Sequence, residues 1–430
     1  MDTSQIYQLY LENRLISTDS RLISDGCIFF ALKGENFDGN KFAAEALEKG
    51  AAYAVADDPE AVTSDRILLV ENTLDTLQEL ARLHRKSFSF PVIALTGSNG
   101  KTTTKELLKC VLSTRFKTYA TQGNLNNHIG VPLTILSVDE RAVEMVIIEM
   151  GANHEKEIAL LCSIAQPTHG LITNIGKAHL EGFGSLEGVK KAKGELYDYL
   201  SKKKGIVFVN AKNEVLMEMA SKRRAFGEII FYNSDNRQST PQIIGQSPFI
   251  SYTADDMTVS TNLVGEYNFG NICAALCVAD YFGISPDDAH LAISNYVPGN
   301  NRSQIVRQNT NTIILDAYNA NPSSMAAALE NFAKMEAGHK MVVLGDMLEL
   351  GHESRAEHEL LGEIIAKGNF DTVLLFGKEI AHALSRLPRA YYFPDKFSLH
   401  NWIMDHPCQN SHILIKGSRG MGLESIVNFL

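Results

Sequence analysis

Short apolar runs alternate with amphipathic segments along most of the chain. Runs of four or five apolar residues, each long enough for one buried strand, occupy 92–95, 145–148, 312–315, 341–344 and 372–376. Segments with helical character, among them 103–112 and 272–281, lie between such runs. Strands that alternate with helices are typical of an α/β fold built on mostly parallel sheets.

Two breaks in this pattern divide the chain. With 430 residues it is too long for a typical single core, so two or three domains are expected. A new strand–helix unit begins after about residue 88, and Pro298-Gly299 interrupts the pattern as a hinge does. We expect a small α/β domain at 1–88, a central domain with a mostly parallel sheet at 89–296, and a doubly wound α/β domain at 297–430.

Local patterns give more detailed expectations. The spacing of Ile6, Leu9 and Tyr10 predicts a short amphipathic helix. The run from 26 to 34 predicts one strand that ends at Lys33-Gly34. The stretch 121–134 is rich in Gly and Asn and has no periodicity, so we expect a loop that either contacts a ligand or forms a surface turn.

The composition is that of a globular enzyme, with 45% apolar and 21% charged residues. A net charge of −10 and the absence of long basic runs argue against nucleic acid as a partner. Six cysteines without repeated pair spacing indicate buried thiols in a reducing compartment. We see neither a signal peptide nor an apolar run of membrane-spanning length, and expect a cytoplasmic protein.

Residues 91–106, PVIALTGSNGKTTTKE, form a strand, a small-residue loop and a helix start in that order. Glycines in such a loop let backbone N–H groups face a phosphate, and the helix N-terminus adds partial positive charge. Lys101 supplies a cation for the β- and γ-phosphates, and Thr102 a hydroxyl for Mg²⁺. The alternative is a tight turn followed by a surface lysine.

Polar side chains follow several other predicted strands. Glu149 ends a buried strand, where a Mg²⁺-binding carboxylate of a phosphate-loop protein lies, although a helix cap or salt-bridge acid fits as well. His179 follows the strand end at 171–175, and Lys193 opens a helix, where taken alone it is a surface lysine. Asn268 and Asn271 are helix caps or partners for an adenine edge.

The remaining candidates lie at the two ends of the chain. In the first domain Ser20, Arg21 and Lys33 form an anion site or a solvated loop. In the third domain three strands lead into polar segments at 316–322, 345–349 and 416–420. Ligands of open α/β sheets bind at the carboxyl ends of strands, so these segments are expected to face a ligand.

Together these stretches resemble the Mur ligases, the ATP-dependent amino-acid and peptide ligases of peptidoglycan assembly. The resemblance is carried by TGSNGKTTTK, GNLNNHIGVPLT, EMGANHEKEI, TNIGKAHLEGFGS, DAYNANPSSM, GDMLELG and KGSRGM, and DSRLISDGCIFFALKGENFDGNKF extends it into the first domain. It implies a UDP-sugar-binding first domain, a central phosphate-loop ATPase domain and a third domain that closes on it. ATP and Mg²⁺ are the implied cofactors.

Within the family, DAYNANPSSM and GDMLELG favour an acid–D-amino-acid ligase that joins D-alanyl-D-alanine to UDP-N-acetylmuramoyl-tripeptide. This reaction passes through an acyl phosphate and is the last cytoplasmic step in making the UDP-MurNAc-pentapeptide precursor. Another Mur-type or folylpolyglutamate-type ligase is the nearest alternative, and a nucleotide-binding regulator without ligase activity is a third. We expect a monomer with UDP-MurNAc-tripeptide and D-Ala-D-Ala as substrates.

The resemblance also implies roles for single residues. ATP is expected to contact Thr96, Gly97, Ser98, Asn99, Gly100, Lys101, Thr102, Thr103, Asn268, Asn271, Arg302 and Asp316. Thr102 and Glu149 are expected to bind Mg²⁺, and His179 to help hold a second Mg²⁺. Lys193 matches a family lysine that is often carbamoylated, and as a carbamate it would join His179 as a metal ligand. The expected catalytic residues are Lys101, His179 and Lys193. UDP-sugar is expected at Ser20, Arg21 and Lys33, and the dipeptide at Asn319 and Asn321. Tyr267 departs from the family, which has histidine there.

Overall fold

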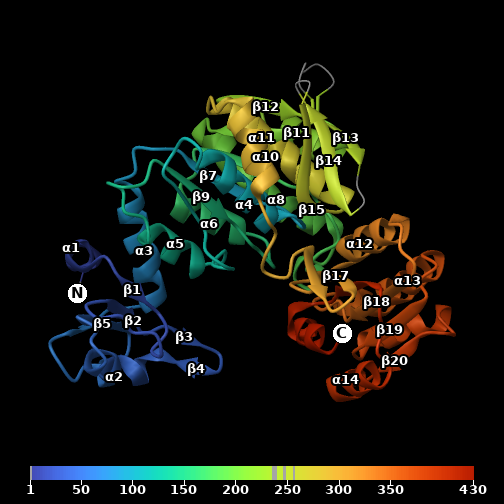
Figure 1. Ribbon diagram of the computed structural model, residues 1–430. Coiled ribbons are helices and arrows are strands. Elements are labelled where there is room, and N and C mark those ends of the chain that lie inside the picture. Colours follow the sequence, from blue (N-terminus) through green and yellow to red (C-terminus); the bar gives the residue numbers. More distant parts are fainter. Residues whose placement is uncertain (1, 235–239, 246–247, 255–256) are drawn as a thin grey trace.

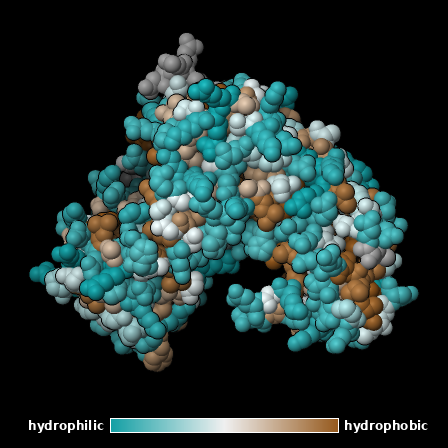
Figure 2. All heavy atoms as spheres, turned by 180° about the vertical axis from the view of Figure 1, so that it is seen from behind, coloured by the Kyte–Doolittle hydropathy of each residue, from teal (hydrophilic) through white to brown (hydrophobic). Residues whose placement is uncertain are grey.

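The structure is a computed structural model that describes residues 2–234, 240–245, 248–254 and 257–430. Three α/β units follow one another along the chain (Figure 1). The central unit lies between the other two, which form separate lobes on the same side of it. Seen from behind, the surface between these two lobes is deeply hollowed (Figure 2).

The first unit is a parallel sheet of strand order β1-β2-β5-β6 with a small two-stranded ribbon at its side. The sheet strands are β1 (Ile16–Ser17), β2 (Ile28–Phe30), β5 (Tyr53–Ala56) and β6 (Ile67–Leu69), and the ribbon pairs β3 (Lys33–Gly34) with β4 (Phe37–Asp38). The helices are α1 (Thr3–Asn13), η1 (Gly39–Phe42), α2 (Ala43–Glu48), η2 (Pro59–Ala61) and α3 (Thr73–Arg85).

The expectation of one strand through Lys33-Gly34 is wrong, because β2 ends at Phe30. After Phe30 the chain turns and β3 pairs with β4 instead. Gly39 then packs so closely on this turn that a Cβ at residue 39 would lie 2.5 Å from the carbonyl oxygen of Leu32. The expected helix at Ile6, Leu9 and Tyr10 is confirmed as α1.

Helices α1 and α3 fasten the first unit to the central one. The Tyr10 hydroxyl donates to the carbonyl of Leu136 at 2.7 Å, and the Arg85 Nε donates to the carbonyl of Ala165 at 2.7 Å. His84 is fully buried, with its Nε2 2.8 Å from the carbonyl oxygen of Val138. Leu136 and Ala165 are the last residues of two helices of the central unit, where carbonyl groups have no partner within the helix.

The central unit is built on a parallel sheet of strand order β12-β11-β10-β7-β9-β8. Its strands are β7 (Val92–Thr96), β8 (Thr118–Ala120), β9 (Met145–Glu149), β10 (His169–Ile172), β11 (Ile206–Asn210) and β12 (Glu228–Tyr232), and β13 (Gln242–Gly245), β14 (Phe249–Ala254) and β15 (Met257–Val264) form an antiparallel sheet beside it. The helices are α4 (Lys101–Leu112), α5 (Gly130–Leu136), α6 (Glu157–Ala165), α7 (Leu180–Phe183), α8 (Leu186–Lys203), α9 (Glu214–Ser221), η3 (Glu266–Asn268), α10 (Phe269–Tyr281) and α11 (Pro286–Asn295).

The expected loop at 121–134 is only partly correct, because α5 begins at Gly130. Asn127 prepares this helix start, since its Oδ1 accepts from the backbone N–H groups of Ile129 at 3.1 Å and Gly130 at 2.8 Å. Pro132 lies in the first turn, where a missing N–H costs nothing. Gly130 and Pro132 therefore have the composition of a loop but belong to a helix.

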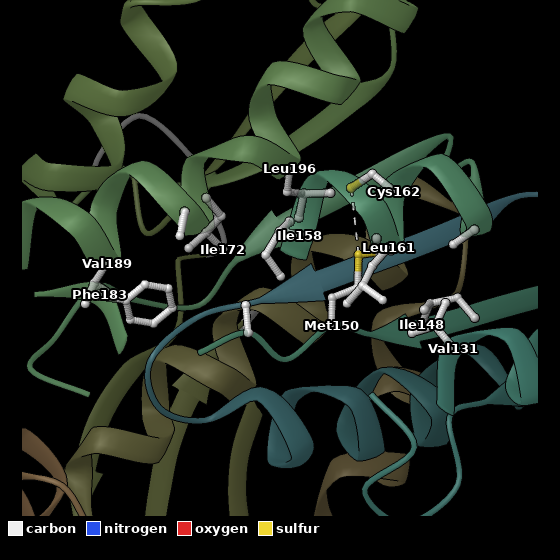
Figure 3. Packing of buried hydrophobic residues seen from close by; sticks show 14 of the residues in the cluster. Val131, Ile148, Met150, Ile158, Leu161, Cys162, Ile172, Phe183, Val189 and Leu196 are labelled. Atoms are coloured by element: carbon white, nitrogen blue, oxygen red, sulfur yellow. Dashed lines mark hydrogen bonds between the residues drawn. The ribbon is translucent and has the colours of Figure 1, made fainter. Parts of the chain in front are cut away.

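The core of the central unit lies between its sheet and the helices that cover it. On one face, Ile148 of β9 and Met150, the residue after β9, form an apolar layer with Ile158, Leu161 and Cys162 of α6 (Figure 3). The Sγ of Cys162 lies 3.8 Å from the Sδ of Met150 (Figure 3). On the other face α4 and α10 pack side by side, so apolar side chains bury β7 on both faces. A continuous apolar run is the pattern expected for such a strand.

The third unit has a six-stranded sheet, within the described residues, of order β16-β17-β21-β18-β19-β20. Its strands are β16 (Gln304–Gln308), β17 (Asn311–Asp316), β18 (Lys340–Gly345), β19 (Thr372–Phe376), β20 (Tyr391–Phe393) and β21 (His412–Lys416), and its helices are α12 (Pro322–Lys334), η4 (Gly351–Glu353), α13 (Ser354–Lys367), η5 (Glu379–Arg386), α14 (Lys396–Asp405), η6 (Arg419–Met421) and η7 (Leu423–Phe429). All pairs are parallel except the edge pair β16 and β17. The predicted fold class is confirmed, while the domain boundaries at 88 and 296 stay a prediction.

In the described residues we find no helix long and apolar enough to span a bilayer.

A buried carboxylate organises the loop after β18. The Asp346 carboxylate accepts from the backbone N–H groups of Lys378 at 3.0 Å and Ile380 at 2.8 Å. Gly377 lies against it with a φ of +125°, and a Cβ there would be 2.3 Å from Oδ1 of Asp346. Only glycine fits both this backbone conformation and this space.

We therefore predict that Gly377→Ala destabilises the third unit by about 1–3 kcal/mol, because backbone strain of this kind carries that cost. The measurement is the urea midpoint of unfolding, followed by circular dichroism. Gly338→Ala is the matched control, since a Cβ at 338 meets no atom within 4 Å. Equal midpoints for the two variants would contradict the account of Gly377.

Candidate active site between the central and third units

Two glycines shape the loop between β7 and α4. Gly97 has a φ of +150°, and a Cβ there would lie 2.0 Å from Oγ1 of Thr173. Gly100 is the residue before α4 and has a φ of +77°, with the Asn271 amide 2.6 Å from the position of its Cβ. The loop is therefore closely packed on neighbouring elements, and its glycines are required by space as well as by backbone conformation.

Lys101 bends back over this loop. Its Nζ donates to the carbonyl of Gly97 at 2.6 Å and to that of Ser98 at 3.3 Å. Burial lowers the pKa of Lys101 to about 8. The alternative of a lysine on the open surface is therefore wrong for this residue.

Glu149 ends β9 beside the loop and is only 1% exposed. Its Oε2 accepts from the Thr102 hydroxyl at 2.9 Å, and its Oε1 accepts from the Asn126 side-chain amide at 2.8 Å. Lys105 Nζ lies 3.9 Å from Oε2, so the salt-bridge alternative for Glu149 has a partner. The pair of Thr102 and Glu149 places a hydroxyl and a carboxylate at one point, as a phosphate-bound Mg²⁺ requires.

Asn99 joins the loop to two different sheets. Its backbone N–H donates to Oδ1 of Asn174 at 2.9 Å, and its carbonyl accepts from Oγ1 of Thr173 at 2.6 Å. Its side chain reaches the third unit, where Nδ2 of Asn321 donates to it at 2.8 Å and Oγ of Ser323 accepts from it at 3.0 Å. The third unit thus touches the phosphate loop directly.

Asn268 and Asn271 form a chain of amides next to the loop. The Thr104 hydroxyl donates to Oδ1 of Asn271 at 3.1 Å, and Nδ2 of Asn271 donates to Oδ1 of Asn268 at 2.9 Å. Asn268 precedes α10, but its side chain makes no capping hydrogen bond. Its Nδ2 donates instead to the carbonyl of Val264 at 2.8 Å. The capping alternative is wrong for Asn268.

The hinge brings charged groups to the same place. The Arg302 guanidinium lies 3.6 Å from the centroid of the Tyr318 ring, and its Nε is buried without a hydrogen-bond partner among the described residues. Asp316 is paired with Lys416, whose Nζ lies 2.5 Å from Oδ2. A buried guanidinium nitrogen without a partner is costly unless a ligand supplies an acceptor.

His179 and Lys193 belong to the part of the central unit that follows β10. His179 has a φ of +53°, precedes α7, and its Nδ1 is hydrogen-bonded to the Glu349 carboxylate. Lys193 lies in α8 with 1% exposure, and its Nζ donates to the carbonyl of Ala152 at 3.1 Å. Burial, and then the charge of Lys101, lower the pKa of Lys193 well below its usual range. The surface-lysine alternative is wrong for Lys193.

A cavity of about 490 Å³ gathers most of these groups. The predicted residues that line it are Ser98, Asn99, Gly100, Lys101, Thr102, Thr103, Glu149, His179, Asn268, Asn271, Arg302, Asp316, Asn319 and Asn321. Three others lie behind this wall: Thr96 donates its hydroxyl to Met150, Gly97 packs on Thr173, and Lys193 binds Ala152. The cavity is formed by the central and third units together.

The candidate UDP-sugar residues lie apart from this cavity in the first unit. Arg21 pairs with Asp19 at 2.6 Å and is exposed, and Lys33 lies 3.6 Å from Asp38. The carbonyl of Ser20 accepts from Lys49 at 2.8 Å. Their role toward UDP-sugar stays a prediction.

The candidate dipeptide residues are largely occupied by the protein itself. Asn321 is the N-cap of α12, with its Oδ1 accepting from the backbone N–H of Ser324 at 2.9 Å, and its Nδ2 is bound to Asn99. Asn319 Oδ1 accepts from the N–H of Ala320 at 2.9 Å. Both line the cavity, and a role in holding the dipeptide stays a prediction for both.

Within the described residues, no group of three or more His, Cys, Asp or Glu is arranged to hold a metal ion by itself. Mg²⁺, however, is usually held by one or two carboxylates together with substrate phosphates and water. Thr102 and Glu149 are hydrogen-bonded to each other and line the same cavity as the phosphate loop, so this pair fits Mg²⁺ bound with a nucleotide, and His179 lines the cavity as a further donor.

Comparison with known proteins identifies the family. The Mur ligase family, catalytic domain matches residues 13–85, the Mur ligase middle domain residues 95–279, and the Mur ligase, glutamate ligase domain residues 301–419. The UDP-N-acetylmuramoyl-tripeptide–D-alanyl-D-alanine ligase of Bacillus subtilis (strain 168) is 35% identical over 96% of this chain and 92% of its own. The chain belongs to the Mur ligase family. The Escherichia coli (strain K12) ligase of the same name is 36% identical to this Mur ligase over 96% of the chain and 93% of its own.

Solved structures agree with this Mur ligase over nearly its whole length. MurF from Acinetobacter baumannii has a TM-score of 0.87 at 31% identity, and covers 97% of this chain and 96% of its own. MurF ligase from Thermotoga maritima, solved in complex with ADP, has a TM-score of 0.85 at 30% identity, with 97% of both chains covered. Folylpolyglutamate synthase of Mycobacterium tuberculosis, at 15% identity and a TM-score of 0.63, shares the fold alone.

Several lining residues of this Mur ligase carry no assignment from the sequence. Asn126 binds Glu149, Asn174 holds the backbone of Asn99, and Ser323 binds the Asn99 side chain. Each lies shortly after a strand or in the polar loop at 121–134, and this position in the sequence could have marked it as a candidate for the site. Nothing in the pattern says which of several polar residues there turns toward the phosphate loop.

We predict that Gly97→Ala weakens ADP binding by more than about tenfold, because the new methyl group displaces the loop from Thr173. Isothermal titration calorimetry with ADP measures this. Gly270→Ala is the control, since residue 270 precedes Asn271 in α10 and a Cβ there meets no atom within 4 Å. ADP affinity of Gly97→Ala equal to that of the control would show that the loop tolerates the side chain.

Proposed function

We propose that this Mur ligase joins D-alanyl-D-alanine to UDP-N-acetylmuramoyl-tripeptide at the expense of ATP. The observation that carries the proposal is the single cavity in which the phosphate loop, Glu149 and polar groups of the third unit meet. Relatives from Bacillus subtilis and Escherichia coli that align over almost the whole chain bear the name of this reaction. The motifs DAYNANPSSM and GDMLELG agree with it.

ATP binds, in this proposal, with its phosphates on the loop 97–102. Lys101 then donates to phosphate oxygens in place of the two backbone carbonyl groups that it contacts here. A hydrogen bond between two charged groups is stronger than one between an ammonium group and a neutral carbonyl. Arg302 offers the unpartnered Nε as a further donor. The adenine lies toward Asn268 and Asn271. Support comes from the related ligase of Thermotoga maritima, which was solved with ADP.

Thr102 and Glu149 hold one Mg²⁺ in this proposal, and His179 helps to hold a second. When bound, Mg²⁺ neutralises charge on the phosphates and on the transferred phosphoryl group. Lys193 joins His179 only if its amine reacts with CO₂ to give a carbamate, as the family resemblance implies. The lowered pKa of Lys193 favours this reaction, because a neutral amine is the form that attacks CO₂.

The reaction has two steps. A carboxylate oxygen of the tripeptide attacks the γ-phosphorus of ATP, the bond to the β-phosphate oxygen breaks, and an acyl phosphate and ADP are formed. The neutral amine of D-Ala-D-Ala then attacks the acyl carbon, loses a proton, and inorganic phosphate leaves. The first step brings an anion to a polyanion, so it depends on the fixed positive charges of Lys101 and Arg302.

The position of the third unit protects the intermediate. An acyl phosphate is lost if water reaches it, so the site must close around it. Contacts of Asn321 and Ser323 with Asn99 place the third unit over the phosphate loop and support this role. We further propose that the enzyme works as a monomer in the cytoplasm, where ATP and UDP-sugars are found.

The substrate assignment predicts that phosphate release requires all three substrates together. We expect phosphate and ADP only when UDP-MurNAc-tripeptide, D-Ala-D-Ala and ATP are present, measured by a coupled phosphate assay and by mass spectrometry of the pentapeptide product. D-Ala alone, L-Ala and glutamate are the comparison amines. Equal activity with a single amino acid would assign the chain to a sister ligase, and ATP turnover without ligation would favour a regulator.

The role of Lys101 predicts that Lys101→Ala lowers kcat by about a hundredfold or more, as loss of one charged donor at a developing anion does. Lys109→Ala is the matched control, because Lys109 is an exposed lysine of the same helix α4. Substrate-dependent phosphate release measures both. A Lys101→Ala enzyme as active as the Lys109→Ala enzyme would remove the phosphate loop from the mechanism.

A further inference from the structure

A clasp joins two loops that are 170 residues apart. Glu349 follows β18 in the third unit, and its carboxylate is hydrogen-bonded to Nδ1 of His179, which follows β10 in the central unit. A second bond runs beside it, from the backbone N–H of Glu181 to the carbonyl of Glu349 at 3.1 Å. Gly351 packs on Glu181 next to these bonds, since a Cβ at residue 351 would lie 3.4 Å from the Cα of Glu181.

The loop that carries Glu349 is held from behind by its own unit. The backbone N–H of Met347 donates to Nε2 of His358 at 3.1 Å, and that of Leu348 donates to Oγ of Ser418 at 2.9 Å. His358 is fully buried, and its Nδ1 lies 2.7 Å from the carbonyl of Ser354, so Nδ1 carries the hydrogen and Nε2 accepts. Asp346 fixes the loop start through Lys378 and Ile380. Glu349 is therefore presented by a preorganised loop.

Both ends of the clasp have unusual backbone conformations. Glu349 has a φ of +63° and His179 a φ of +53°, and neither is a glycine. Residues held in the left-handed region cost about 1 kcal/mol or more, and they persist where surrounding contacts determine them, often at functional sites. An ordinary exposed ion pair stabilises a protein by only about 0–1 kcal/mol, which is too little to offset the cost of two left-handed backbone conformations. Glu349 is itself half exposed.

The bond to Nδ1 decides which nitrogen of His179 is available. A histidine that ligates a metal usually donates its other ring N–H to a carboxylate or carbonyl, which fixes the ring and raises the basicity of the ligating nitrogen. With Nδ1–H donated to Glu349, Nε2 is the nitrogen that can accept a metal ion. His179 lines the cavity, whereas its carboxylate partner comes from the other unit.

We propose that Glu349 is a positioning residue that orients His179 for the metal ion, so that the metal site is complete only when the third unit is docked. This inference rests on the proposed function, in which His179 holds Mg²⁺. The GDMLELG segment, which carries Glu349, then acts in metal binding, separately from the binding of phosphate and dipeptide. It also couples closure of the site to the metal, because the carboxylate leaves His179 when the units separate.

The test measures Mn²⁺ binding to the enzyme–ADP complex by electron paramagnetic resonance, with no turnover involved. Glu349→Ala is expected to weaken Mn²⁺ binding by about 10- to 100-fold, the usual cost of losing such a partner. Glu349→Gln keeps an oxygen that accepts from Nδ1–H, so its loss is expected to be smaller. Glu353→Ala, which removes an exposed carboxylate paired with His352 of the same unit, is expected to bind Mn²⁺ like the unaltered enzyme.

His179→Ala separates this inference from the proposed function. If His179→Ala binds Mn²⁺ normally, the metal role of His179 itself fails. If His179→Ala is weakened but Glu349→Ala matches the Glu353→Ala control, the metal role stands and the positioning role of Glu349 is overturned. The double variant is expected to bind Mn²⁺ no more weakly than His179→Ala, because Glu349 acts through His179. Additive losses would show that Glu349 acts elsewhere.

Discussion

The hydrogen bonds of Asn99 hold the phosphate loop between two sheets that belong to different parts of the chain. The backbone of Asn99 is bound by Thr173 and Asn174 of the central unit, and its side chain by Asn321 and Ser323 of the third. One such bond contributes only about 0.5–1.5 kcal/mol net. The hydrogen bonds of Asn99 are therefore directional enough to orient the third unit on the phosphate loop. They are also weak enough to break when the two units separate, as a site that admits two large substrates requires.

Positive charge is concentrated locally in a protein whose net charge is −10. The cavity has four cations at or just behind its wall, Lys101, Arg302, Lys416 and Lys193. Among the residues that the structure describes, only Lys416 has a close carboxylate partner, in Asp316. Burial of unpaired cations is costly, which lowers the pKa of Lys101 and Lys193. A bound phosphate group relieves this cost, and the free energy gained in this way contributes to the affinity for phosphate.

The alignment of parallel strands explains why residues so distant in sequence meet. β7 lies between β10 and β9, so the segments that follow these three strands emerge at one edge of the central sheet. In the third unit β17, β21 and β18 are neighbours as well, and Asp316, Lys416 and Asp346 mark their ends. The site forms where these two edges face each other, and the hydrogen bond between Glu349 and His179 joins the loops that follow β18 and β10.

The sequence alone determined the fold class and almost half of the residues that line the cavity. Apolar runs of four or five residues predict buried parallel strands, because burial on both faces leaves no room for alternation. Since ligands of such sheets bind at the carboxyl ends of strands, the polar residues at strand ends, such as Glu149 and Asp316, could be expected to face a ligand. That these two belong to one site was implied by the resemblance to the Mur ligases. The glycine, lysine and threonine order of the loop predicts the phosphate cradle, because few sequences combine small residues and a cation at a helix start.

Which residues contact one another in the site was decided only by the tertiary structure. Nothing local distinguishes Asn174 from its polar neighbours, or shows that Lys193 is buried while Lys191 is exposed. The start of α5 at Gly130 and the end of β2 at Phe30 were equally hidden, because Gly and Pro suit both turns and helix starts. The pairing of Glu349 with His179 spans two sheets, and a contact of that kind is set by how the units pack, which no pattern within either segment records.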